Sequence, residues 1–279
     1  GIDSSVCLAL AVRGLGADRV LGVLLPEHDS SEASGRLATD LAAHFGVETV
    51  TEDLTDGLAG LGSYRRRDEA IRNVFPEYGE GYKSRITLPG NLLESGALNV
   101  FTLTIVAPDG SEQSKRVDPA SLRQIIAATN FKQRTRTAML YYHAERLHYA
   151  VVGTPNKNEH DQGFFVKWGD GAYDVAPIRH LFKTQVYQLA AHLGIPKAIQ
   201  EATPTSDTYS AGATQEEFFF RLPFAVMDVL WLALESDVPA AEAAAAMDLT
   251  EEQVERVYRD LEVKGRNTEY LRTPQLHYG

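Results

Sequence analysis

The chain opens with Gly1-Ile2-Asp3-Ser4-Ser5-Val6-Cys7-Leu8-Ala9-Leu10-Ala11-Val12, a short polar turn that runs directly into an apolar helical stretch. Such a turn presents backbone N–H groups and the positive end of a helix dipole to a phosphate. The alternative is an ordinary helix start, with Asp3 or Ser4 as the N-cap and no ligand. A strand should lead into the turn, so we expect one upstream of Gly1 and interpret the sequence as a fragment of a longer chain.

The residues that follow alternate between strand and helix patterns. Residues 19–25 are typical of a buried strand that ends at Pro26, residues 31–45 have the apolar spacing of a helix, and residues 47–51 form a second strand pattern. This order predicts an α/β fold with a doubly wound, mostly parallel sheet flanked by helices. In such sheets ligands bind beyond the carboxyl ends of the strands, where the loop at residues 26–31 would lie.

Residues from about 62 to 118 interrupt the alternation. Residues 99–106 alternate as a strand does, Pro108-Asp109-Gly110-Ser111 is a turn signal, and residues 115–117 lead back. The pattern predicts an inserted β-hairpin. It either influences substrate choice or decorates an edge of the fold without touching a ligand.

The second half of the chain is predominantly helical. Asp118 and Pro119 begin a helix that runs to about residue 146, and residues 181–193 form another. Residues 149–152 predict a strand that ends at Gly153 and Thr154. The part from about residue 215 to 270 is predicted to be helical, and we expect residues 1–279 to form one domain.

Composition narrows the class of protein. The formal net charge of −11 argues against a nucleic-acid partner, which requires a basic surface. Residues 239–264 have the outline of a helix-turn-helix, but the acidic second helix would repel phosphates, which favours a packed helix pair. The single cysteine, Cys7, excludes an intrachain disulfide, and no stretch is apolar enough to predict a membrane span. We therefore expect a cytoplasmic protein.

A second motif occupies residues 153–174, which read Gly-Thr-Pro-Asn-Lys-Asn-Glu-His-Asp-Gln-Gly-Phe-Phe-Val-Lys-Trp-Gly-Asp-Gly-Ala-Tyr-Asp. With Gly1-Ile2-Asp3-Ser4, it resembles the ammonia-dependent NAD synthetases of the ATP-pyrophosphatase superfamily. The phosphate loop of that superfamily reads Ser-Gly-Gly-x-Asp-Ser, and residues 1–4 match its last four positions. The longer motif matches the family pattern Gly-Thr … Glu … Gly-Phe-Phe-x-Lys-x-Gly-Asp-Gly … Asp with its spacing intact.

The resemblance implies the fold of the adenine nucleotide alpha hydrolases and a reaction in which ATP adenylates a carboxylate. Pyrophosphate leaves, and ammonia then displaces AMP to form an amide. The implied substrates are deamido-NAD, ATP with Mg²⁺, and ammonia, either free or from a separate glutaminase. A homodimer is also implied. A related ligase that acts on a different carboxylate is the alternative.

The resemblance also assigns roles to individual residues. It places Gly1, Asp3 and Ser4 in the pyrophosphate-binding loop, Asp3 and Glu159 at magnesium, and Thr154 and Thr214 at the nucleotide. It makes Lys183 the catalytic lysine that faces the phosphates. It places Lys167, Asp170 and Asp174 around the second substrate and the ammonia site, with both aspartates catalytic, and Arg134 and Arg136 in the same pocket. Without the resemblance, Asp170 would be interpreted as a turn former, Glu159 as a solvated carboxylate, and the two arginines as a solvated helix face.

The match weakens after Pro204. Gln215 stands where the family has an aspartate, and the run Phe218-Phe219-Phe220 has no counterpart there. Near the carboxyl end, residues 269–274 keep only an arginine and a proline of the family's basic segment. The activation of a carboxylate by ATP is therefore predicted more firmly than the identity of that carboxylate.

Overall fold

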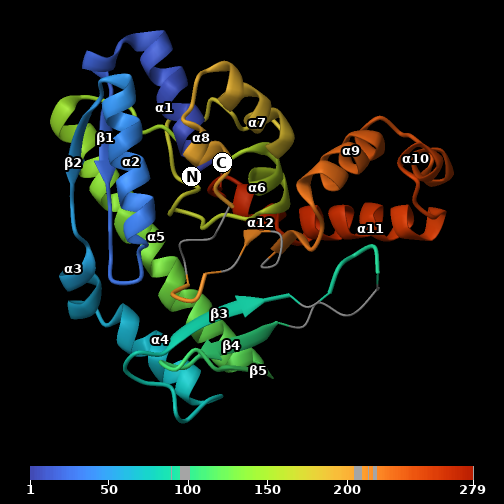
Figure 1. Ribbon diagram of the computed structural model, residues 1–279, viewed down its shortest axis with the longest axis horizontal. Helices are drawn as coiled ribbons and strands as arrows, with labels where there is room; N and C mark the ends of the chain where they lie inside the picture. Colours follow the sequence, from blue (N-terminus) through green and yellow to red (C-terminus); the bar gives the residue numbers. More distant parts are fainter. Residues whose placement is uncertain (89, 95–100, 204–208, 213, 216–218, 279) are drawn as a thin grey trace.

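The computed structural model describes residues 1–88, 90–94, 101–203, 209–212, 214–215 and 219–278. Helix α1 (Ile2–Leu15) starts at Gly1 and leads through a short 3-10 helix, η1 (Ala17–Arg19), into strand β1 (Leu21–Leu24). Helix α2 (Glu32–Phe45) ends at Gly46, whose φ of 67° lies in the left-handed region, and strand β2 (Glu48–Thr51) follows. Strands β1 and β2 pair in parallel, with Leu21 opposite Glu48, so the predicted strand–helix–strand unit is confirmed (Figure 1).

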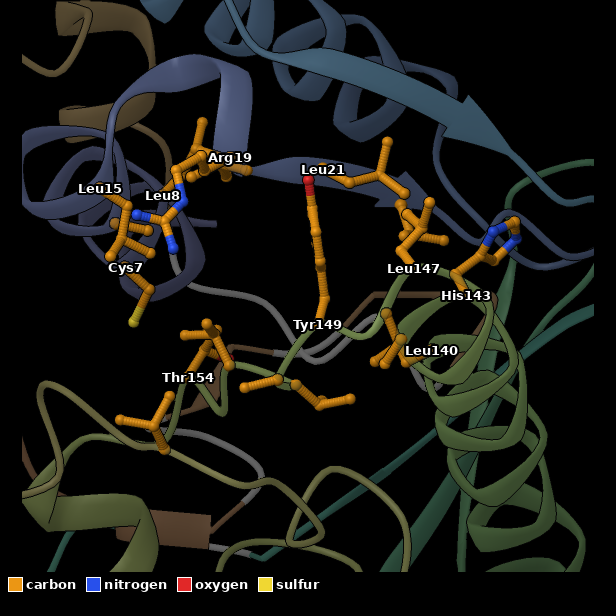
Figure 2. A pocket seen from close by; sticks show the side chains of 18 of the residues that line it. Cys7, Leu8, Leu15, Arg19, Leu21, Leu140, His143, Leu147, Tyr149 and Thr154 are labelled. Atoms are coloured by element: carbon orange, nitrogen blue, oxygen red, sulfur yellow. The ribbon is translucent and has the colours of Figure 1, made fainter.

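The predicted strand at residues 149–152 is wrong. In the described chain these residues form only an isolated parallel bridge, between Val152 and Val175. An apolar cavity of about 450 Å³ separates them from β1, so no strand among the described residues lies close enough to pair with them. The side chain of Tyr149 projects across this cavity toward Leu21 (Figure 2).

Two helices follow β2, and the interrupting segment, which begins with the second of them, continues as an antiparallel sheet. Helices α3 (Thr55–Gly60) and α4 (Ser63–Arg72) precede strands β3 (Lys83–Thr87), β4 (Thr102–Val106) and β5 (Glu112–Arg116). The predicted hairpin is present as β4 and β5, with Val106 opposite Glu112; β3 adds a third strand that the sequence pattern did not predict. Residues 99 and 100 of the predicted strand lie outside the described residues.

Helix α5 (Pro119–Leu147) connects this antiparallel sheet to the parallel strands (Figure 1). Its N-cap is Asp118, whose side chain accepts hydrogen bonds from the backbone N–H groups of Ala120 and Ser121, as the Asp-Pro start predicted. The buried side chain of Ile125 anchors α5 to the core beneath the antiparallel sheet, together with Phe75, Ile86, Leu103 and Ile105. The same helix carries Lys132 and Arg136 to the loop that follows β1, and Arg134 to the backbone of Lys167.

A separate apolar cluster sets the position of α1. Helices α6 (Lys157–Gln162), α7 (Lys183–His192) and α8 (Lys197–Gln200) follow α5 in the chain. Val6 of α1 packs with Val186 and Ala190 of α7 in this cluster, and all three side chains are fully buried. This packing brings the beginning of α1 to the beginning of α7.

The carboxyl-terminal part consists of α9 (Phe224–Glu235), α10 (Ala240–Met247), α11 (Glu251–Asn267) and α12 (Glu269–Arg272). Thr250 and Gln253 form the predicted capping box at the start of α11. The apolar faces of α9, α10 and α11 share one buried cluster, which supports a packed helix pair rather than a DNA-binding motif. Every helix in the described ranges is too short or too polar to cross a membrane.

Candidate active site

The first turns of α1 and α7 meet at an ion pair. Lys183 Nζ lies 2.5 Å from Asp3 Oδ2; the lysine side chain is 0% exposed and the aspartate side chain 14%. Burial by itself favours the neutral amine, but the charges of Asp3 and Glu159 raise the pKa of Lys183 above its usual value. The lysine is therefore a buried ammonium next to the amino end of a helix.

Asn156 connects this pair to Glu159. The Asn156 Oδ1 atom accepts a hydrogen bond from the Glu159 backbone N–H (3.0 Å), and Glu159 Oε2 accepts one from the Asn156 backbone N–H (3.1 Å), which is a capping box at the start of α6. The Asn156 side-chain amide also donates to Asp3 Oδ1 at 2.8 Å. One asparagine thus fixes both carboxylates. Sequence reasoning missed it, although the Asn-x-x-Glu spacing is a capping signal.

The two carboxylates create a local excess of negative charge. Burial and the nearby charge of Asp3 raise the pKa of Glu159 well above its usual range, although Lys183 opposes this. Hard carboxylate oxygens beside a phosphate site suit Mg²⁺, which binds through one or two carboxylates and completes its shell with water and substrate oxygens. Asp3 and Glu159 fit that role. No group of three or more His, Cys, Asp or Glu residues that could hold a metal occurs in the described part of the chain.

A pocket of about 140 Å³ opens at this cluster. Gly1, Asp3, Ser4, Thr154, Pro155, Glu159, Phe164, Phe165 and Asp170 line it. Six residues of the predicted site therefore lie around one small space, and Lys183 reaches it through its ion pair with Asp3. Asp170 also accepts a hydrogen bond from the Val166 backbone N–H at 2.7 Å, so it both shapes its turn and borders the pocket.

Two glycines allow the second motif to fold tightly around this pocket. A Cβ atom at Gly153 would lie 2.2 Å from Cγ of Tyr173, and one at Gly171 would lie 2.3 Å from Cδ2 of Phe165. Neither position tolerates a larger residue without displacing an aromatic ring. The two glycines therefore set how closely Thr154 and Asp170 approach the site.

Other predicted residues lie elsewhere. Asp174 accepts hydrogen bonds from the Tyr141 hydroxyl (3.2 Å) and the Val151 backbone N–H (2.8 Å), and it borders a different groove, with Arg179 and Lys157. Thr214 lines a cavity with Thr184 and Phe224, on the α7 and α9 side of Lys183, apart from the pocket at Asp3.

Lys167 and Arg134 tie the carboxyl-terminal segment to α5. Lys167 Nζ donates to the backbone carbonyls of Tyr270 and Thr273, both at 2.9 Å, and Arg134 Nε donates to the Lys167 carbonyl at 3.2 Å. In this structure both side chains donate hydrogen bonds to backbone carbonyls and do not line the pocket at Asp3.

Arg136 belongs to a buried network of charges at the carboxyl end of β1. Its Nε donates to the Leu25 carbonyl (3.3 Å), and a terminal nitrogen lies 3.7 Å from Glu27 Oε1. Lys132 Nζ lies 3.3 Å from the same Glu27 oxygen and pairs with Asp29, which Arg67 also contacts. Sequence reasoning did not identify this network. It fixes the loop at residues 26–31 beyond β1, where the fold predicts a ligand.

The fold and the site have the organisation of an α/β protein with charged side chains and a pocket at the amino ends of α1, α6 and α7. A family model described as NAD synthase matches residues 1–86 and 90–273. The chain is 49% identical over 276 residues to an NH(3)-dependent NAD(+) synthetase of Mesorhizobium japonicum, covering 99% of this chain and 86% of that protein. It is 35% identical over 266 residues to the enzyme of the same name from Thermotoga maritima, covering 94% of this chain and 85% of that protein.

A solved structure supports the fold. The NH3-dependent NAD synthetase from Campylobacter jejuni, in complex with the nitrate ion, superposes with a TM-score of 0.57 at 18% identity, covering 100% of this chain and 86% of that one. The chain belongs to the NAD synthase family. It is an enzyme of the carbon–nitrogen ligase class.

Proposed function

We propose that this chain makes NAD from deamido-NAD, ammonia and ATP, with release of AMP and pyrophosphate. The observation that carries the proposal is the convergence of Asp3, Glu159 and Lys183 at the amino end of α1. Two carboxylates and one buried ammonium beside helix N–H groups are the groups that a metal-bound triphosphate requires. Membership of the family supports the choice of acid and of nitrogen donor.

In the first step a carboxylate oxygen of deamido-NAD attacks the α-phosphorus of ATP. The bond from that phosphorus to the oxygen bridging toward the β-phosphate breaks, and pyrophosphate leaves with the electron pair. Lys183 faces the charge that develops on pyrophosphate, and the N–H groups of the first turn of α1 donate to its oxygens. Mg²⁺ held by Asp3 and Glu159 would supply further positive charge next to the phosphates.

This role requires Lys183 to change partners. Its ammonium now donates to Asp3 at 2.5 Å. A bound polyphosphate offers the lysine a competing anion, and the Oδ2 atom of Asp3 would then be available to a metal ion. The buried position of Lys183 keeps the exchange local, because the chain atoms of α7 are fixed by packing against α1.

In the second step ammonia attacks the acyl carbon and AMP leaves. Ammonium must lose a proton to become a nucleophile, and the amide nitrogen loses another as it forms. We assign Asp170 to attract ammonium and to accept its proton, because this carboxylate borders the same pocket as Thr154 and Glu159. The enzyme takes ammonia from solution or from a separate glutaminase, and we expect it to act as a homodimer.

The test supplies the purified protein with ATP, Mg²⁺, ammonium chloride and deamido-NAD. We expect NAD, AMP and pyrophosphate in equal amounts, and none of them when deamido-NAD is left out. Nicotinate mononucleotide, a shorter acid with the same pyridine carboxylate, is the comparison substrate. AMP formation with that acid alone would overturn the assignment of deamido-NAD, and failure to release AMP with either acid would overturn the proposed chemistry.

A further inference from the structure

Asp228 is a buried carboxylate in an otherwise apolar helix. It is the only charged residue of α9 from Phe224 to Leu234, and it is 3% exposed. Its helix neighbours Met227, Leu230 and Trp231 all lie in the buried cluster formed by the carboxyl-terminal helices. A carboxylate in such surroundings destabilises the fold unless each of its oxygens accepts a hydrogen bond. Its position is therefore informative.

Both oxygens of Asp228 accept hydrogen bonds from elements that carry the active site. Oδ1 accepts from the side-chain amide of Asn158 at 2.5 Å, and Oδ2 accepts from the backbone N–H of Thr184 at 2.8 Å. Asn158 is the residue before Glu159 on α6, and Thr184 is the residue after Lys183 on α7. One side chain of α9 thus contacts both helices.

Asn158 also hydrogen-bonds to Lys183. It is 0% exposed, and its Oδ1 accepts the Lys183 backbone N–H at 2.9 Å. The first N–H groups of a helix have no partner within the helix, so Asn158 and Asp228 supply the acceptors that α7 lacks. A negative charge at this end also interacts favourably with the helix dipole.

The same face of α9 reaches the other end of the lysine. The Lys183 ammonium lies 5.6 Å from the centroid of the Phe224 ring, and Phe224 and Asp228 are four residues apart on one helix. Phe224 therefore lies near the Lys183 ammonium, and Asp228 reaches the Lys183 backbone N–H through Asn158. Helix α9 lies outside the two sequence motifs.

We propose that Asp228 is a positioning residue that, through Asn158 and the first turn of α7, holds Lys183 at the distance from Asp3 and Glu159 that the reaction needs. The inference rests on the proposed role of Lys183. It makes the carboxyl-terminal helices part of the catalytic apparatus through three hydrogen bonds, with no contact between Asp228 and substrate.

The first test compares the Asp228→Asn variant with the wild-type protein. An amide turns a donor toward Thr184 N–H or toward the Asn158 amide, which breaks one hydrogen bond at nearly constant volume. We expect kcat for AMP formation to fall about 10- to 100-fold while KM for ATP changes less than about threefold, as for other residues that orient a ligand-contacting group. The matched control is Asp237→Asn, an exposed aspartate just beyond α9, which should retain wild-type kinetics.

The second test exchanges the two side chains. In the double variant Asp228→Asn with Asn158→Asp, the amide of residue 228 donates to the carboxylate of residue 158, and both backbone N–H groups keep their acceptors. We expect this exchange to recover at least about tenfold of the lost kcat and to restore slow amide exchange in residues 183–190. If Asp228→Asn does not fold, the exchanged pair alone decides: activity near wild type supports the proposal, and an inactive folded protein overturns it.

A third variant separates positioning of Lys183 from a general effect on stability. In a Lys183→Ala background, Asp228→Asn should lower kcat less than about twofold further, because the group that it positions is gone. If Asp228→Asn lowers kcat as much in the Lys183→Ala background as in the wild-type protein, the proposal is overturned. A wild-type kcat in the single variant Asp228→Asn would also overturn it. If the wild-type protein makes no NAD, the proposed function fails, and amide exchange in the exchanged pair still tests whether Asp228 fixes α7.

Discussion

Lys183 Nζ and Asp3 Oδ2 lie 2.5 Å apart and join two helix starts that are 180 positions apart in the sequence. The two charges that would bind phosphate and metal therefore neutralise each other in the protein alone. Asn156 donates to the other Asp3 oxygen at 2.8 Å, so the aspartate would keep this partner if the lysine turned to a phosphate. This arrangement leads to predictions that test each charged group separately.

Removal of the lysine should impair the first chemical step. We expect Lys183→Ala to lower kcat for AMP formation by about 10²- to 10³-fold, because a preorganised cation no longer opposes the charge on the leaving pyrophosphate. Lys183→Arg should recover only part of the rate, since the 0% exposed site has no room for a guanidinium. Lys197→Ala, on the surface of α8, is the control. Wild-type kcat in Lys183→Ala would remove this residue from the mechanism.

Glu159→Gln should weaken the binding of Mg²⁺ but stabilise the folded protein in the absence of the metal. Loss of a carboxylate ligand should raise the Mg²⁺ concentration for half-maximal activity by at least about tenfold. The unliganded protein should become more stable, since burial and Asp3 disfavour the charged form of Glu159 and raise its pKa. Magnesium titrations and chemical unfolding without metal measure the two effects. An unchanged magnesium requirement would exclude Glu159 as a ligand.

Asp170→Asn tests the ammonia step. We expect KM for ammonium to rise about tenfold or more while KM for ATP stays within about twofold, because the amide keeps the turn but no longer attracts a cation. The hydrogen bond from the Val166 backbone N–H remains available to the amide oxygen, so the fold should be preserved. Initial rates over a range of ammonium concentrations at fixed pH measure this, and an unchanged KM for ammonium would contradict the assignment.

The buried charges beyond β1 should give the fold a dependence on acid pH. Burial alone would raise the pKa of Asp29, but the charges of Arg67 and Lys132 lower it to about 2. A carboxylate whose pKa is lower in the folded than in the unfolded chain stabilises the fold above its unfolded value, near pH 4, and loses this contribution as pH falls toward 2. The contribution is about 2 kcal/mol at neutral pH.

The measurement is the free energy of unfolding of wild-type and Asp29→Asn proteins from pH 7 to pH 3. The difference between the two free energies should shrink by about 1 kcal/mol over this range, because Asp29 takes up a proton in the unfolded chain before it does so in the folded one. A difference that does not change with pH would show that the ion pairs with Arg67 and Lys132 contribute nothing that depends on the charge of Asp29.

Features encoded within a few residues could be predicted from the sequence. The Asp118–Pro119 helix start, the turn at residues 108–111 and the Thr250–Gln253 capping box all occur as expected, because each depends on neighbours close in the chain. Six residues that the motif resemblance singled out line one pocket: Gly1, Asp3, Ser4, Thr154, Glu159 and Asp170.

Features that depend on distant partners could not be predicted. Residues 149–152 have the composition of a strand, but a strand exists only where an edge lies beside it, and a cavity separates these residues from β1. Asp228 looks like an interruption in an apolar run until α6 and α7 supply its hydrogen bonds. Lys132 gives no sign, in a helix of mixed composition, that it is buried between Glu27 and Asp29.

The most direct measurement follows heavy oxygen from the carboxylate of labelled deamido-NAD during turnover with ATP and ammonium. Attack of that carboxylate on the α-phosphorus leaves one labelled oxygen on the phosphate of AMP when ammonia displaces it, and we predict one label for each NAD formed. Unlabelled AMP, or ADP with inorganic phosphate as products, would contradict the account.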